Sequence, residues 1–155
     1  MVAEEIVLFG LVKFSILRDQ LLIHFYKSSQ NQAQGGNVVW VILFKTLEGV
    51  DYYGDRPDAL EDDDPRGEFY GFDIDRQYWN NLEADFIDPV DALCGTLLDL
   101  YEDDFFGVEQ CVKLKAWIEE RLTRETCPAL KPIYEKILEY AIKAIDLGTG
   151  IIIQF

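Results

Sequence analysis

The sequence predicts an α+β fold: a single domain in which an antiparallel sheet from the N-terminal half, joined by a C-terminal strand, carries three helices from the second half on one face. Three observations lead to this expectation. Short β-branched and aromatic runs separated by turn residues fill the first half, which is typical of strands. From residue 88 onward, apolar residues recur at helical spacing. The 155 residues, 49% of them hydrophobic, are enough for one proper core.

The first third predicts an antiparallel meander of three strands. Residues 6–14 and 21–26 are rich in β-branched and aromatic side chains, and the polar residues 18–20 between them favour a hairpin. A helix over residues 6–14 is the competing interpretation, because periodicity does not separate strand from helix in so short an apolar run. Residues 38–44 are continuously apolar, which predicts a central strand buried on both faces.

The middle of the chain predicts a loop followed by a strand. Residues 46–67 are rich in Gly, Pro and Asp and are expected to form an exposed loop inserted in a single domain of residues 1–155. Residues 68–75 predict a strand, and a short helix is expected around residues 77–86. One face of the strand holds Phe69, Gly71, Asp73 and Asp75, and the other holds Tyr70, Phe72 and Ile74.

Two helices are predicted after residue 87. The first begins at Asp88, a capping acid that precedes Pro89 at the first helical position. Its apolar positions are Val90, Leu93, Cys94, Leu97, Leu98 and Tyr101. The apolar positions of the second helix are Val108, Cys111, Val112, Ile118 and Leu122.

A third helix and a final strand complete the predicted fold. Thr126 caps this helix, Pro128 and Pro132 fall in its first turn, and Gly148 ends it. Its apolar face consists of Leu130, Ile133, Tyr134, Ile137, Ala141, Ala144 and Ile145. Residues 150–155 are β-branched and strongly apolar, and such a strand would be an aggregation hazard if it were exposed. We therefore expect it to join the N-terminal sheet.

The charge of the chain is concentrated in its middle. The formal net charge is −15, from 29 acidic and 14 basic residues. Residues 48–109 hold 20 acids and only three bases, which gives −17, while the remaining 9 acids and 11 bases give +2. This balance argues against binding to DNA or RNA, whose phosphates require Lys and Arg, and against an anionic membrane surface. It favours a cation or a basic protein as the partner.

The cysteines and the N-terminal residues indicate a cytoplasmic protein. Cys94, Cys111 and Cys127 stand at wide spacings without a CxxC pair, so we expect small buried thiols in a reducing compartment. The chain begins with acidic residues, which is not typical of a signal peptide. Charged residues interrupt its first apolar stretch well before the roughly 20 residues that a membrane helix needs.

Groups suited to catalysis are few. His24 is the single histidine and lies inside an apolar run, so a core or sheet-face histidine is expected there. With one histidine and scattered cysteines, zinc is not expected, and the glycines do not follow a strand as a phosphate loop requires. We expect no cofactor. The alternative is a small metal-dependent hydrolase in which Asp73 and Asp75 bind Mg²⁺ together with residues 62–64.

The acidic stretch is the candidate site for binding a partner. Tyrosines are interleaved with its carboxylates; acids attract and orient a partner, and aromatic side chains anchor interfaces. The other interpretation is a solvated negative face whose aromatic side chains turn inward. The candidate partner-binding residues are Asp51, Tyr52, Tyr53, Asp55, Asp58, Glu61, Asp62, Asp63, Asp64 and Tyr70.

This profile resembles bacterial toxin-immunity proteins of the contact-dependent inhibition type. The resemblance depends on the acidic run of residues 51–64, its interleaved tyrosines and the scarcity of catalytic groups. It implies a non-enzymatic protein that blocks a basic toxin, such as a nuclease, by occluding the surface that holds nucleic-acid phosphates. An acidic subunit of a larger assembly is a further alternative.

Overall fold

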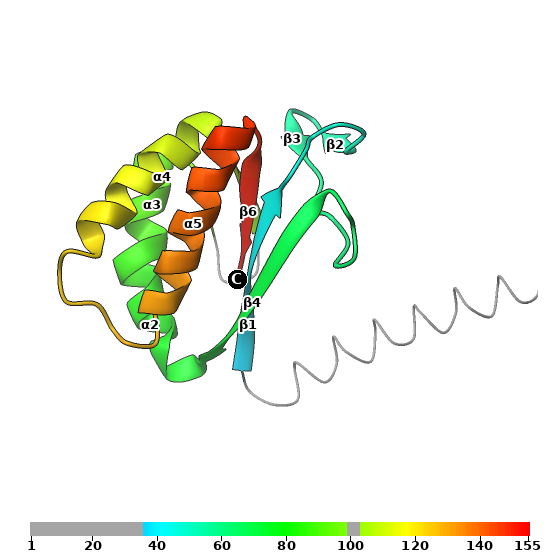
Figure 1. The fold of residues 1–155 in the computed structure, drawn as a ribbon. Helices are drawn as coiled ribbons and strands as arrows, with labels where there is room; N and C mark the ends of the chain where they lie inside the picture. The colour runs from blue at the N-terminus through cyan, green and yellow to red at the C-terminus, as the bar shows by residue number, and fades with distance from the viewer. Residues whose placement is uncertain (1–35, 99–102) are drawn as a thin grey trace, which may run out of the picture. The chain divides into compact units, whose positions relative to one another are not determined.

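The structure, a computed structural model, describes residues 36–98 and 103–155 (Figure 1). Along the described residues, four strands are followed by four helical segments, one strand, two helices and a final strand, in an α+β arrangement. The strands are β1 (Gly36–Phe44), β2 (Tyr52–Tyr53), β3 (Arg56–Pro57), β4 (Gly67–Asp75), β5 (Asp103–Gly107) and β6 (Gly150–Gln154). The helical segments are η1 (Arg76–Tyr78), α2 (Trp79–Leu82), η2 (Glu83–Ile87), α3 (Asp88–Cys94), α4 (Val108–Arg121) and α5 (Lys131–Leu147).

Four of the strands form one antiparallel sheet in the order β4-β1-β6-β5. In its centre, Ile42 of β1 lies opposite Ile152 of β6, and Ile152 also lies opposite Phe105 of β5. Residues 41–44 of β1 and 150–153 of β6 are all buried, which explains the continuous apolar sequences of these two strands. The predicted strands at 38–44, 68–75 and 150–155 are confirmed, and the last of them is an inner strand.

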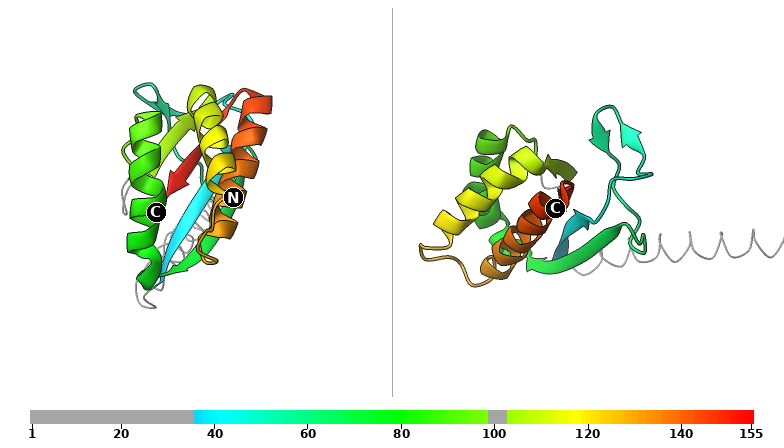
Figure 2. Two further views of the ribbon diagram at one scale, coloured as in Figure 1. Left: turned by 90° about the vertical axis from the view of Figure 1, so that its left-hand side faces the viewer. Right: turned by 45° about the horizontal axis from the view of Figure 1, so that its top comes forward.

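The helices cover one face of this sheet, as the sequence predicts (Figures 1 and 2). Val41 of β1 and Ile153 of β6 point into a core shared with the helices, since alternate strand residues share a face. The fully buried helical side chains of this core include Phe86, Leu114, Ile118, Tyr134, Ile137 and Tyr140. Phe86 stacks on Tyr134 with 5.2 Å between ring centroids.

The chain between β1 and β4 covers part of the other face, which we call the helix-free face because no helix of the described residues packs on it. Ile42, Phe44 and Ile152 point to this side and form a second core cluster with Val50 and Leu60. Leu47, Phe69 and Phe105 pack against that cluster. The predicted loop at 46–67 is therefore anchored by its own apolar residues and contains the short hairpin of β2 and β3 (Figure 1).

Asp88 begins α3 with Pro89 in its first turn, as predicted, but the prediction that Asp88 caps a free helix end is wrong. Helical structure runs without a break from Arg76 to Cys94, and Ile87 just before Asp88 is itself helical. Pro89 has no N–H to donate and would clash with the carbonyl four residues earlier in a regular α-helix. The five-residue π-helix η2 precedes it, and the Asp88 N–H bonds to the Glu83 carbonyl across the wider turn. The proline is thus accommodated inside the helix.

The predicted continuation of this helix to Tyr101 is also wrong. Gly95, with φ of +68°, ends α3, and Leu97 is 80% exposed. Leu98 is buried, and Tyr101 lies outside the described residues. The chain then forms β5, a strand that the helical pattern did not predict.

The two later helices agree with the prediction except at their edges. Cys111 and Ile118 are buried in α4, whereas Val108 and Val112 are exposed. The third helix, α5, begins at Lys131 rather than beside Thr126, because residues 127–130 form a turn closed by the Leu130 N–H and the Cys127 carbonyl. Its predicted apolar face and its end at Gly148 are confirmed.

Two predictions involve residues that the structure does not describe. The strands expected at 6–14 and 21–26 lie outside the described residues, and so does the helix considered over 6–14. Residues Asn37–Phe155 form one compact unit, and the single domain over 1–155 stays a prediction. In the described part of the chain, no helix combines the length and the apolar character needed to cross a membrane.

Candidate protein-binding surface

A tight hairpin presents the two adjacent tyrosines of the acidic stretch. Tyr52 pairs with Pro57 and Tyr53 with Arg56, so Gly54 and Asp55 make a two-residue turn. Gly54 has φ of +68°, which suits glycine at the first turn position of a type II′ hairpin. Both tyrosines are exposed, and Tyr53 reaches 84%. The alternative expectation, aromatic side chains turned inward, does not describe these two residues.

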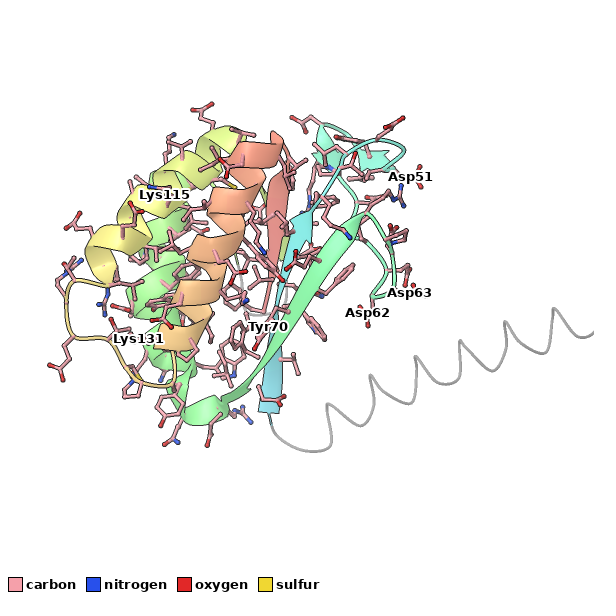
Figure 3. All side chains as sticks on the ribbon, in the orientation of Figure 1. Asp51, Asp62, Asp63, Tyr70, Lys115 and Lys131 are labelled. Atoms are coloured by element: carbon pink, nitrogen blue, oxygen red, sulfur yellow. The ribbon has the colours of Figure 1, made fainter. Side chains whose placement is uncertain are left out.

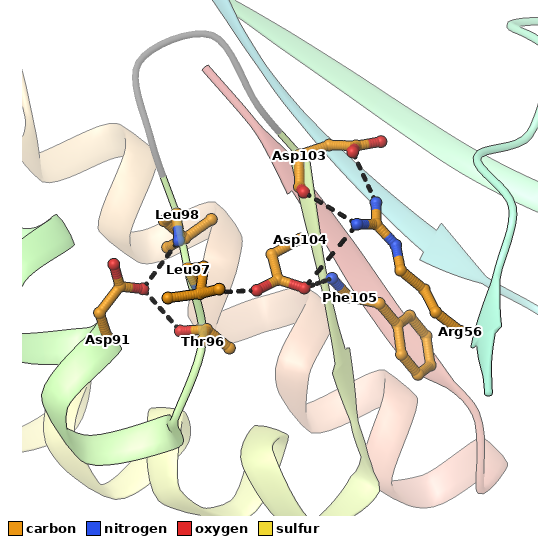
Figure 4. A network of polar contacts seen from close by, with 8 residues as sticks. All are labelled: Arg56, Asp91, Thr96, Leu97, Leu98, Asp103, Asp104 and Phe105. Atoms are coloured by element: carbon orange, nitrogen blue, oxygen red, sulfur yellow. Dashed lines mark hydrogen bonds and ion pairs between the residues drawn. The ribbon is translucent and has the colours of Figure 1, made fainter. Parts of the chain in front are cut away.

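Arg56 connects this hairpin to strand β5 (Figure 4). Its Nη2 lies 2.5 Å from Asp103 Oδ1, and its Nη1 donates to the Asp103 carbonyl at 3.1 Å. Asp104 Oδ1 is 4.0 Å from Nη1 and also accepts from the Phe105 N–H, and its other oxygen accepts from the Leu97 N–H. Asp103 and Asp104 are therefore engaged within the fold and are not available to an external cation.

Asp64 also has a structural role. Its carboxylate accepts from Nε and Nη2 of Arg66 and from the Arg66 backbone N–H, at 2.6–3.2 Å. The Arg66 side chain, whose Nη1 donates to the Gly49 carbonyl, lowers the pKa of Asp64 to about 2. This pair joins the two ends of the loop. Of the predicted binding residues, Asp64 is the acid that the fold neutralises.

The loop packs closely on the start of β4. Leu60 is buried, and a Cβ on Gly67 would lie 2.9 Å from Leu60 Cδ1 and 2.7 Å from Phe69 Cζ. Glycine at position 67 permits this contact between loop and strand. The underside of the loop is thus apolar and fixed, and its charged side chains are left on the outside.

The remaining carboxylates of the loop form a surface that we call the acidic face. Its members are exposed and make no ion pair or side-chain hydrogen bond with the rest of the described chain: Glu48, Asp51, Asp55, Asp58, Glu61, Asp62 and Asp63. Figure 3 shows Asp51, Asp62 and Asp63 on the helix-free side of the sheet. In contrast, several acids of α4 and α5 pair with a lysine three or four residues away. Exposed charges that the fold does not neutralise remain available to a cationic partner.

Tyr70 does not belong to the acidic face. Alternation along β4 places it with Phe72 and Ile74, on the helical side of the sheet (Figure 3). Lys136 of α5 lies 4.6 Å from its ring centroid, and the Phe72 ring is 4.7 Å away. Tyr70 is 43% exposed, so it is accessible, but the sheet separates it from the other predicted binding residues.

The carboxylates considered for a metal lie on two different elements. Asp73 and Asp75 are exposed on the helix-free side of β4, where Asp75 accepts from the Gln77 N–H and caps η1. Asp62 and Asp63 belong to the loop. Across residues 36–98 and 103–155, no group of three His, Cys, Asp or Glu side chains is arranged to hold a metal ion. His24 lies outside the described residues.

A polar cluster on the helical side was not predicted from the sequence. Asp85, in the π-helix, accepts from Arg121 of α4 and from the hydroxyl of Tyr134 of α5. Burial and this hydrogen bond raise the pKa of Tyr134. A cavity of about 310 Å³ adjoins the cluster, lined by Asn81, Ala84, Asp85, Arg121, Cys127 and Leu130. Arg121 also donates to the Glu125 carbonyl and Thr126, so the charged groups beside the cavity are already bonded within the protein.

Comparison with known proteins adds no identification. No protein-family model matches the chain, and no curated protein or solved structure matches it. The surface described above is therefore the basis for a functional proposal.

Proposed function

We propose that this chain is a non-enzymatic binding protein that neutralises a basic protein partner through the acidic face together with Tyr52 and Tyr53. In its most specific form the proposal is an immunity protein that blocks a cognate bacterial toxin, such as a nuclease, in the cytoplasm. The carboxylates would occupy the cationic groups with which such a toxin holds phosphates, and the body of the protein would deny substrate access.

The observation that carries this proposal is the division of the carboxylates into two groups. Asp64 pairs with Arg66, and Asp103 and Asp104 pair with Arg56. These ion pairs fix the loop and the hairpin in place. Seven other acids of the loop are exposed and make no ion pair within the described chain. A surface positioned before binding loses little conformational freedom on association, and its uncompensated charge accelerates encounter with a basic partner.

The tyrosines supply the apolar part of such an interface. Tyr52 and Tyr53 are large side chains with few rotatable bonds, and rigid aromatic residues of this kind are enriched among those that dominate binding energy. Tyr53 stands almost free of the protein at the hairpin tip, with carboxylates at positions 51 and 55 on either side. Attraction by charge and anchoring by an aromatic ring thus occur on one small element.

The test is a charge reversal that spares the structural acids. The partner is first retained from host lysate at low salt, released at high salt, identified and purified. Binding of the purified partner is then measured for the double variant Asp62→Lys, Asp63→Lys, with Asp64 left intact because it holds Arg66. The matched control is Glu120→Lys, Glu125→Lys, which makes the same charge change at exposed sites outside the loop. Weaker partner binding by the Asp62→Lys, Asp63→Lys variant alone supports the proposal. Equal affinity of both variants and the wild type for the partner contradicts it.

A further inference from the structure

Among the described residues, the two outer strands of the sheet differ in how they are covered. Strand β5 is five residues long, its residues are half-buried or buried, and Arg56 bonds to its Asp103 side chain and carbonyl. Strand β4 is nine residues long and is the last strand on its side within the described sheet (Figure 1). Tyr70, Gly71, Asp73 and Asp75 of β4 are exposed. An uncovered edge strand presents backbone N–H and C=O groups that another chain can bind.

The middle of β4 has little side-chain bulk on the helix-free face. Gly71 lies directly beneath the indole of Trp40, and a Cβ there would be 2.9 Å from Trp40 Cζ3. The ring fills the space that a side chain at position 71 would take, and the backbone of the glycine stays exposed. A glycine inside a strand often marks a site where another backbone approaches closely.

The charges of β4 indicate which kind of chain could pair with this edge. Residues Gly67–Asp75 contain Glu68, Asp73 and Asp75 and no Lys or Arg. A second copy of the chain pairing along the same edge would bring two such acidic strands together, and like charges on neighbouring strands are destabilising. Pairing with a segment rich in Lys or Arg would instead be favourable. Its cations would lie beside Asp73 and Asp75, which pair with no cation in the described chain.

We propose that β4 receives an extended, basic segment of the partner protein as an additional strand of the sheet. This inference rests on the proposed function, since that function supplies the basic partner. The two faces of β4 also define the sequence pattern of the segment. Lys or Arg at alternate positions faces Asp73 and Asp75 on the helix-free side, and apolar residues at the intervening positions lie beside Tyr70 and Phe72 on the helical side.

The test uses a probe peptide with full-length protein. The probe is an N-acetylated, C-amidated peptide of alternating lysine and valine, about nine residues long to match a strand of this length. Two further peptides carry N-methyl groups on the backbone nitrogens of all lysines or of all valines. In a strand, successive N–H groups point to opposite edges, so only one of the two methylated peptides loses the groups that would bond to β4. Charge and side chains are identical in all three.

The expected result is asymmetric binding. The unmodified peptide binds, one methylated peptide binds more weakly by at least about tenfold because several hydrogen bonds are lost, and the other retains its affinity. In the protein, Asp73→Lys weakens the unmodified peptide by about two- to fivefold, whereas Glu120→Lys on α4 does not. Equal binding of all three peptides means attraction by charge alone and overturns the strand-addition proposal, as does no binding of the unmodified peptide.

Failure of this inference is distinguishable from failure of the proposed function. If the Asp62→Lys, Asp63→Lys variant loses the natural partner while the methylated peptides bind alike, the acidic face is the binding surface and β4 is not. If the charge reversal has no effect on the partner, the proposed function fails regardless of the peptide result.

Discussion

The hydroxyl of Tyr134 in α5 donates a 2.7 Å hydrogen bond to Asp85 in the π-helix, and the same carboxylate accepts from Arg121 of α4. One carboxylate thus connects three helical segments that are far apart in sequence. The π-helix projects Asp85 toward both partners at the point where Pro89 interrupts the regular hydrogen-bond pattern. Because Arg121 and Tyr134 are largely buried, the tyrosine hydroxyl and the Nε and Nη2 groups of Arg121 depend on Asp85 for pairing, whereas Nη1 of Arg121 donates to Glu125 and Thr126.

Removing Asp85 should therefore destabilise the helical layer more than removing the tyrosine hydroxyl. Tyr134→Phe deletes one hydrogen bond and is expected to lower the free energy of unfolding by about 1 kcal/mol. Asp85→Ala leaves a mostly buried arginine without its carboxylate partner and is expected to cost about 3 kcal/mol. Urea denaturation measures the free energy of unfolding of both variants, with Asp88→Ala as a control at an exposed position. A larger loss in Tyr134→Phe than in Asp85→Ala would contradict this account.

Asp64 should make the stability of the loop depend on pH in the acid range. Arg66 lowers its pKa from the ordinary 3.8 to about 2, so between these values the unfolded chain binds more protons than the folded one. The stabilisation of the folded state by the Asp64–Arg66 pair is complete above about pH 4 and is lost as the pH falls toward 2. Asp64→Asn removes this contribution, and the difference in unfolding midpoint between wild type and variant should shrink as the pH is lowered from 5 to about 2. A difference that stays constant would exclude the pair as its cause.

Arg56 should control the mobility of the hairpin with little effect on global stability. Its guanidinium bonds to Asp103 beside it, and both side chains remain about one third exposed. In Arg56→Met, we expect faster amide hydrogen exchange at Tyr53 and a nearly unchanged urea midpoint, since exposed ion pairs contribute little to unfolding free energy. Arg76→Met, at another exposed arginine, serves as the control and should leave the exchange at Tyr53 as it is in the wild type.

The three thiols should differ in reactivity. Burial raises the pKa of Cys94 to about 11 and of Cys111 to about 12, so both are protonated and shielded at pH 8. Cys127 is half-exposed beside the helical cavity. A thiol reagent at pH 8 should modify one cysteine rapidly and the other two only on unfolding. Loss of the rapid phase in Cys127→Ser, and its persistence in Cys94→Ser, would identify the reactive residue.

Local sequence patterns were sufficient for most of the fold. The continuous apolar runs of β1 and β6 predict strands with two buried faces, and the helical spacing of Ile133, Ile137 and Ala141 predicts the buried side of α5. Strand β5 was missed because Asp103 and Asp104 resemble solvated loop residues. Their pairing with Arg56, which lies 47 residues earlier, keeps these acids in the sheet and has no local signal.

The candidate site shows the same limit. Sequence predicts where carboxylates are dense, but it does not show that Asp64 is bonded to Arg66 while Asp62 and Asp63 point outward. The alternation along residues 68–75 was sufficient to predict the face on which Tyr70 lies. It places Tyr70 on the same face as the core residue Ile74, and this was sufficient reason to separate Tyr70 from the acidic loop.

The position of β6 has a consequence for how the protein is made. This strand follows every other described element along the chain, yet it lies between β1 and β5, which each bond to one of its sides. During synthesis at the ribosome, β1 can pair with β4 early, but neither β1 nor β5 can pair with β6 until residues 150–154 have emerged, more than 100 residues after β1. During this interval the β6-facing edges of β1 and β5 are unpaired, and unpaired apolar strand edges of this kind favour binding by a chaperone.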